Sequence, residues 1–115
     1  MIPALELANR AARRGPFFIV FNVKSGHRNA EEEIQTISRV LEEGGRDFEF
    51  LQLKAPEPVD VLARRAVELA KAHHGVVVAA GGDGTINAVA NAVLGSGCPF
   101  GVLPQGTFNY FGRDN

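Results

Sequence analysis

The chain of 115 residues is long enough for about one domain with a single hydrophobic core. Hydrophobic residues make up 45% of it, charged residues 22%, and the formal net charge is -1, which argues against disordered and fibrous classes. The 12 basic residues are offset by 13 acidic ones, so the sequence gives no case for nucleic acid as a partner.

Neither cysteine content nor apolar runs indicate an exported or membrane-spanning protein. Cys98 is the only cysteine, which rules out an intramolecular disulfide and fits a cytoplasmic protein; we interpret it as a small buried hydrophobe. The longest apolar runs, 17–21 and 76–80, are far shorter than the ~20 residues of a membrane-spanning helix. Any membrane contact is therefore expected to be peripheral, at the inner face of the membrane.

The first part of the chain predicts a tail, a strand and a helix. Residues 1–15 mix both charge signs without a long apolar core, so we interpret them as a leader helix or tail, not a secretory signal. Residues 17–21 are continuously apolar, which is typical of a strand buried on both faces of a parallel sheet. Asn29 can cap a helix, with Glu32 at capping-box spacing, and Gly44-Gly45 ends it.

Two further strand-helix units follow. Residues 48–53 predict a second strand, and Pro56 and Pro58 precede a helix that Gly75 is expected to end. The apolar side of this helix comprises Leu62, Ala66, Leu69 and Ala70. Residues 76–80 predict a third strand that runs into the string Gly81-Gly82-Asp83-Gly84-Thr85. The next helix has its apolar positions at Ile86, Val89, Ala90 and Val93.

A short fourth strand is predicted at 100–103, after the glycines of 95–97 have ended the third helix. This alternation predicts an α/β fold: a three-layer, open, mostly parallel sheet with helices on both faces, Rossmann-like in type. Ligands of such sheets bind at the carboxyl ends of the strands. The segments 22–26, 81–85 and 104–109 emerge there and are rich in glycine, hydroxyl and amide groups, which indicates a phosphate-bearing ligand.

The string 81–85 lies where backbone N–H groups and a helix N-terminus favour phosphate. A carboxylate at Asp83 would repel phosphate unless it binds Mg²⁺, often through water, or accepts a proton from an attacking hydroxyl. The structural alternative is a tight turn in which Asp83 or Thr85 caps the helix. The string matches neither the Walker P-loop nor the G-x-G-x-x-G fingerprint.

Three segments together resemble a known family. Strand-Gly-Gly-Asp-Gly-Thr-helix is similar to a signature of diacylglycerol kinases, sphingosine kinases, NAD kinases and, more distantly, phosphofructokinases. Residues 21–26 resemble the N-P-x-S-G segment of the lipid kinases, and 101–109 resemble their P-x-G-T-x-N segment. The resemblance covers about 17–115 and points to the diacylglycerol-kinase-like catalytic domain, with the fold of the NAD kinase and diacylglycerol kinase type.

The resemblance implies ATP and Mg²⁺ as cofactors, with Asp83 as the catalytic residue and a Mg²⁺ contact through water. The implied ATP-binding residues are Asn22, Ser25, Gly26, Lys54, Gly81, Gly82, Asp83, Gly84, Thr85, Gly106, Thr107 and Asn109. Three departures stand out: Val23 replaces the family's first-loop proline, Ala88 replaces an acidic residue after the glycine string, and Tyr110 replaces the aspartate of an Asn-Asp pair.

The resemblance also implies that 16–115 is the nucleotide-binding domain of a lipid kinase whose β-rich C-terminal domain is missing here. We therefore expect the isolated chain to be an incomplete catalyst, with transient membrane contact made through that second domain. Phe108, Tyr110 and Phe111 are interpreted as packing residues for it instead of adenine-stacking residues, and in its absence this aromatic group could drive a homodimer.

The expected activity is ATP-dependent phosphorylation of a lipid hydroxyl, with diacylglycerol as the default acceptor. Sphingoid bases, phosphatidylglycerol and undecaprenol-like alcohols remain alternatives as acceptors. An NAD kinase-like enzyme and a non-catalytic nucleotide-binding or regulatory domain remain alternatives as functions. His73 and His74 are expected to complement a helix dipole in preference to binding metal, and His27 to be solvated.

Overall fold

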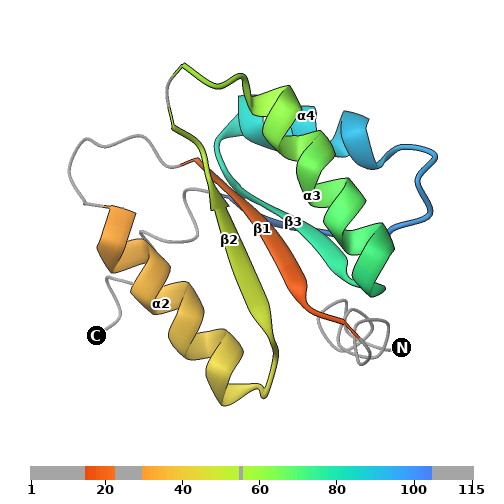
Figure 1. Ribbon diagram of the computed structural model, residues 1–115. Helices are drawn as coiled ribbons and strands as arrows, with labels where there is room; N and C mark the ends of the chain where they lie inside the picture. Colours follow the sequence, from red (N-terminus) through yellow and green to blue (C-terminus); the bar gives the residue numbers. More distant parts are fainter. Residues whose placement is uncertain (1–14, 23–29, 55, 105–115) are drawn as a thin grey trace.

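The computed structural model describes residues 15–22, 30–54 and 56–104, and within them strands and helices alternate along the chain (Figure 1). The elements are β1 (Phe17–Asn22), α2 (Ala30–Glu43), β2 (Phe48–Gln52), α3 (Val59–His73), β3 (Val76–Gly81), α4 (Asp83–Val93) and β4 (Phe100–Pro104). Every strand and helix predicted from the sequence within these ranges is present. The strand boundaries differ from the predicted ones only at their carboxyl ends.

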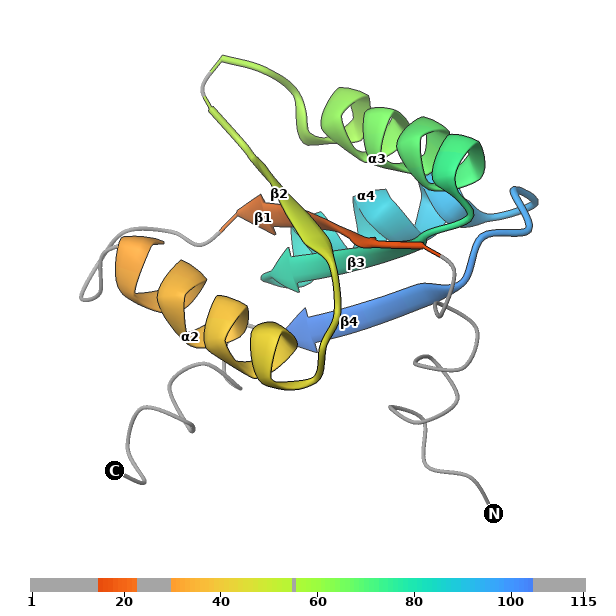
Figure 2. The same ribbon diagram turned by 60° about the horizontal axis from the view of Figure 1, so that its bottom comes forward.

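The described strands form a four-stranded sheet in the order β2-β1-β3-β4, with all neighbours parallel (Figure 2). At its amino-terminal edge Phe17 lies opposite both Phe48 and Val76. At its carboxyl edge Asn22 lies opposite Gly81, which in turn lies opposite Pro104. The register therefore brings the ends of β1, β3 and β4 together at one edge of the sheet.

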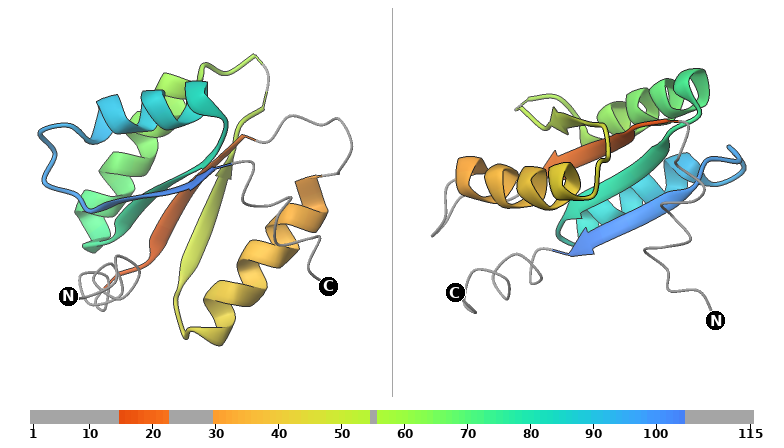
Figure 3. Two further views of the ribbon diagram at one scale, coloured as in Figure 1. Left: turned by 180° about the vertical axis from the view of Figure 1, so that it is seen from behind. Right: turned by 90° about the horizontal axis from the view of Figure 1, so that it is seen from below.

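Helices cover both faces of the sheet, α3 and α4 on one side and α2 on the other (Figure 3). Alternate residues of each strand point to opposite faces, so the apolar runs of β1 and β3 supply two cores. The core under α3 and α4 includes Phe18, Val20, Leu62, Ala66, Val77 and Val89. The core under α2 includes Phe17, Ile19, Phe21, Ile37, Val76 and Val78. This arrangement confirms the predicted three-layer α/β fold.

The chain changes direction across the sheet between β1 and β3. From β1 it passes through α2 on one face to β2, whereas from β3 it passes through α4 on the opposite face to β4 (Figures 1 and 3). The carboxyl ends of β1 and β3 therefore flank a topological switch point, the place where open α/β sheets bind their ligands. The fold alone thus locates the edge at which to look for a site.

The end of α3 differs from the prediction. Gly75 was expected to terminate the helix, but the left-handed residue is His74, with φ 56°. A Cβ on Gly75 would lie 2.4 Å from the Pro16 carbonyl oxygen and 2.9 Å from the Phe18 ring. Gly75 therefore serves the close approach of α3 to the start of β1, and His74 makes the turn.

Candidate functional site

The glycine string is a direct junction between β3 and α4, with almost no loop between them. Gly81 is the last residue of β3, Gly82 is the N-cap of α4, and Asp83 is its first helical residue. The first hydrogen bond of the helix runs from the Ile86 N–H to the Gly82 carbonyl at 3.0 Å. The N–H groups of Asp83, Gly84 and Thr85 precede that bond, so they are the orphan donors of a helix start.

Gly81 is required by its surroundings. Its φ of +157° is rarely adopted by residues with a side chain, and a Cβ there would lie 2.4 Å from the Asn22 carbonyl oxygen and 3.3 Å from the Thr85 Cβ. The end of β1, the end of β3 and the start of α4 therefore meet at closer range than any side chain at position 81 would allow. The glycine serves this convergence in addition to any ligand.

A side-chain hydrogen bond joins the two sides of the switch point. The Asn22 amide Nδ2 donates to the Thr85 hydroxyl Oγ1 at 3.1 Å. Asn22 is half-buried, and Thr85 is only 4% exposed. The alternative in which Asp83 or Thr85 caps α4 is wrong, because the N-cap position is occupied by Gly82, which has no side chain to cap the helix, and the Thr85 hydroxyl accepts from Asn22.

Asp83 and Gly84 form the open part of the junction. Both are exposed, and a Cβ added to Gly84 would meet nothing within 4 Å. The helix dipole places partial positive charge at this end of α4, where an anion is stabilised by about 0.3 to 1 kcal/mol. The Asp83 carboxylate lies in the same first turn, so the local field contains both a positive helix end and an exposed negative charge.

Lys54 lies at the same edge of the sheet, just beyond β2. The N–H of the preceding residue, Leu53, donates to the Phe21 carbonyl, and the Lys54 carbonyl accepts from the Glu57 N–H at 2.9 Å. The Lys54 side chain is exposed and contributes to a groove of about 420 Å³ between β2 and α3. Arg65 and Glu57 line this groove too and are ion-paired at 2.8 Å. Glu49 also lines the groove, so two carboxylates balance the two cationic side chains.

The other residues predicted for the site lie outside the described residues. They are Ser25, Gly26, Gly106, Thr107 and Asn109. The tail 1–14, His27, the substitution at Val23 and the aromatic residues Phe108, Tyr110 and Phe111 lie outside them as well. Within the described ranges no group of three or more His, Cys, Asp or Glu side chains could hold a metal ion. In the same ranges no helix is long and apolar enough to cross a membrane.

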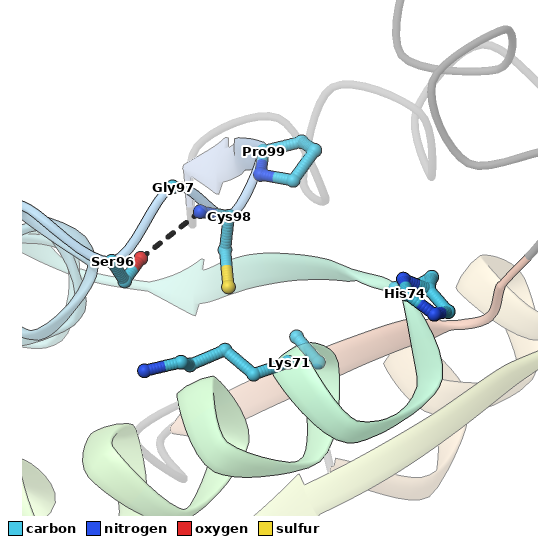
Figure 4. A pocket seen from close by; sticks show the side chains of 8 residues that line it. Lys71, His74, Ser96, Gly97, Cys98 and Pro99 are labelled. Atoms are coloured by element: carbon cyan, nitrogen blue, oxygen red, sulfur yellow. Dashed lines mark hydrogen bonds between the residues drawn. The ribbon is translucent and has the colours of Figure 1, made fainter.

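A second cavity, of about 510 Å³, lies at the opposite edge of the sheet (Figure 4). It separates the end of α3, with Lys71 and His74, from the turn that leads into β4. There the Cys98 N–H donates to the Ser96 hydroxyl at 3.1 Å, and the half-buried thiol lies 4.0 Å from the Val67 carbonyl oxygen. This cavity is remote from the glycine junction, and we assign it no role in the site.

Comparison with known proteins gives the family. The family model described as the diacylglycerol kinase catalytic domain matches residues 16–115. A diacylglycerol kinase of Staphylococcus aureus (strain bovine RF122 / ET3-1) is 32% identical over 97 residues, which are 83% of this chain and 30% of the relative. One from Staphylococcus haemolyticus is 30% identical over 97 residues, 83% of this chain and 28% of the relative.

A third relative, an uncharacterized protein of Synechocystis sp., is 28% identical over 100 residues, which are 81% of this chain and 23% of that protein. The chain thus spans between 23% and 30% of the length of these curated relatives. Because the family model covers nearly all of it, the chain belongs to the diacylglycerol kinase catalytic domain family.

The hydrogen bond between Asn22 and Thr85 was not foreseen from the sequence. Both residues were predicted to contact ATP individually, but their positions differ by 63 residues, and only the register of β1 with β3 brings them together. The predictable signal was the parallel pairing of two strands that each end in a polar or glycine residue.

Proposed function

We propose that this chain is the nucleotide-binding part of an ATP-dependent lipid kinase, which holds Mg-ATP for phosphoryl transfer to a lipid hydroxyl. The observation that carries the proposal is the junction of β3 and α4, where orphan N–H groups and an open glycine face the switch point of the sheet. Membership of the diacylglycerol kinase catalytic domain family supports the same activity.

In this proposal the phosphates of ATP lie against the first turn of α4. The N–H groups of Gly84 and Thr85 donate to phosphate oxygens, and the helix dipole stabilises their negative charge. The lack of a side chain at Gly84 leaves room for a ligand to approach the backbone, since a Cβ there would meet nothing within 4 Å. The pairing of Gly81 with Asn22 and their close approach position these donors relative to β1.

Asp83 is the proposed catalytic residue and the contact for Mg²⁺. Mg²⁺ retains several waters and is commonly held by one or two carboxylates together with substrate phosphates. A single exposed carboxylate in the first turn of α4 fits that mode, and the described residues offer no group of three ligands for a cage made by protein alone. When bound, Mg²⁺ would neutralise phosphate charge, while Asp83 would orient it or accept the hydroxyl proton.

The remaining assignments follow the family. Ser25, Gly26, Gly106, Thr107 and Asn109 are proposed to complete the ATP site, with Lys54 near its border. Diacylglycerol is the proposed acceptor, and a second, β-rich domain is proposed to supply its binding site and the peripheral membrane contact. Location in the cytoplasm, at the inner face of the membrane, belongs to the same proposal.

Two alternative functions make different predictions. An NAD kinase would transfer phosphate to NAD, and the resemblance of 101–109 to the lipid-kinase segment argues against it. A non-catalytic nucleotide-binding domain would bind ATP without phosphorylating any lipid. Ala88, which stands on α4 where the family often has an acidic residue, favours this alternative.

The test is an amide NMR titration of the ¹⁵N-labelled chain with Mg-ATP. We expect saturable shifts at Gly82, Gly84 and Thr85, with the glycines Gly45 and Gly97 as internal controls because they lie in turns at the opposite edge of the sheet. Millimolar Mg-ATP without shifts at the junction would contradict the proposed site. A titration with NAD under the same conditions separates the NAD kinase alternative.

A further inference from the structure

Asn22 and Thr85 are engaged with each other at the centre of the proposed site. Asn22 ends β1, Thr85 lies in the first turn of α4, and the amide-to-hydroxyl bond between them is 3.1 Å long. Thr85 is 4% exposed, so its hydroxyl is shielded from bulk water. A buried hydroxyl needs a hydrogen-bond partner, and Asn22 provides one.

The absence of a side chain at Gly81 allows Asn22 and Thr85 to approach each other. A Cβ at Gly81 would touch both residues, at 2.4 Å from the Asn22 carbonyl oxygen and 3.3 Å from the Thr85 Cβ. Because Gly81 brings the two residues together and Gly82 gives the helix no side-chain cap, the Asn22 amide ties the start of α4 to β1 through a side-chain hydrogen bond. A shift of Thr85 would move the orphan N–H groups of the same turn with it.

We propose that Asn22 and Thr85 are positioning residues of the nucleotide site, whose mutual hydrogen bond holds the phosphate-binding N–H groups of α4 in place relative to β1. This inference rests on the proposed function. It differs from the expectation that each side chain contacts ATP separately. A pair that acts through one bond loses its whole contribution when either member is removed, whereas two separate contacts contribute additively.

The experiment is a double-mutant cycle on the 115-residue chain, with the dissociation constant of Mg-ATP measured by NMR. We expect Thr85→Val, which replaces the hydroxyl by a methyl group of similar size, to weaken binding about tenfold, the effect of one lost hydrogen bond at the upper end of its range. Asn22→Ala should weaken it to the same extent, and the double variant no further. Thr85→Ser, which retains the hydroxyl, should remain within about twofold of the parent.

Thr36→Val is the matched control. It removes a threonine hydroxyl that donates to the Glu32 carbonyl at 3.0 Å on α2, away from the junction, so Mg-ATP affinity should be unchanged. Urea unfolding of each variant separates loss of fold from loss of site, and Asn22→Ala tests the same bond if Thr85→Val does not fold.

Two results would overturn the inference while leaving the proposed function intact. One is parental Mg-ATP affinity in both folded single variants, which would make the bond a matter of stability alone. The other is full additivity in the double variant, which would mean that each side chain binds ATP by itself. If the parent chain binds no Mg-ATP, the proposed function fails, and this inference fails with it.

Discussion

Gly81 is the residue at which backbone geometry and the site are most closely linked. Gly81→Ala adds a Cβ in a strained conformation and against the Asn22 carbonyl, so we expect a loss of about 2 to 4 kcal/mol in the free energy of unfolding. Urea denaturation followed by circular dichroism measures it. Gly45→Ala is the control: its φ is +70° but its surroundings are open, so only the conformational cost of about 1 kcal/mol applies. Equal losses would contradict the close contact.

Asp83 gives a prediction whose sign depends on the metal. Without Mg²⁺ the carboxylate repels phosphate, so Asp83→Asn should strengthen ATP binding by about threefold, as removal of an exposed like charge allows. With Mg²⁺ present the carboxylate attracts the metal complex, and the same variant should weaken binding. Titration calorimetry in Mg²⁺ and in EDTA measures both constants. Asp47→Asn, at the opposite edge of the sheet, should change neither, and a metal-independent effect at Asp83 would refute the Mg²⁺ contact.

Within the described residues, residue types and their spacing predicted that Asn22, the glycines of 81–84 and Thr85 lie at the carboxyl edge of the sheet. Their partners could not be predicted in the same way. Threonine often caps helices, yet the Thr85 hydroxyl accepts a hydrogen bond from Asn22, because strand register outweighs the local capping preference. Glycine often terminates helices, yet a glycine is needed at position 75 because a side chain there would collide with the Phe18 ring. Both outcomes depend on tertiary distances that one-dimensional spacing does not contain.

At the scale of elements, the end of α3 offers a gain in stability. His74 adopts φ 56°, where glycine has no Cβ penalty, and its N–H donates to the Ala70 carbonyl as the helix closes. We expect His74→Gly to raise the free energy of unfolding by about 0.5 to 1 kcal/mol. Urea or thermal unfolding measures it.

The neighbouring His73 is the control for that change. It is the last residue of α3, and its ring lies 5.9 Å from the ring of Phe18, so His73→Gly should lower stability by about 1 kcal/mol. A loss at position 74 as large as that at position 73 would mean that His74 has contacts that outweigh its backbone strain.

The elements themselves were predictable because each has one dominant signal. Continuous apolar runs mark β1 and β3, which are buried on both faces, and the helices follow the 3.6-residue period. The order β2-β1-β3-β4 was not predictable to the same degree. Right-handed crossovers limit the possible strand orders. Choosing among the remaining orders requires knowing which face of the sheet each helix covers, and the sequence does not contain that information.

At the scale of the whole molecule, β2 is an outer strand of the described sheet, so its amides should alternate in protection from hydrogen exchange. The Leu53 N–H donates to Phe21 and the Asp47 carbonyl accepts from Phe17, so odd-numbered residues of β2 face β1. The Leu51 amide should therefore exchange at least about tenfold more slowly than the amide of Phe50, which points away from the sheet. Amide exchange in D₂O checks this alternation, and equal protection of both would mean that a further strand, outside the four of the described sheet, pairs with β2.

Because β1 lies between β2 and β3 in the sheet, it acquires both neighbouring strands only after each has been synthesised. β1 is the first strand made, but β3, one of its two neighbours, is followed only by α4 and β4 within the described part of the chain. Until β3 has been made, one side of the β1 backbone lacks its hydrogen-bonding partner strand. The apolar side chains on both faces of Phe17–Asn22 also lack part of their cover. A nascent chain of this protein therefore carries an uncovered apolar strand until Gly81 has been made, and we expect chaperone contact with β1 to be strongest before that point.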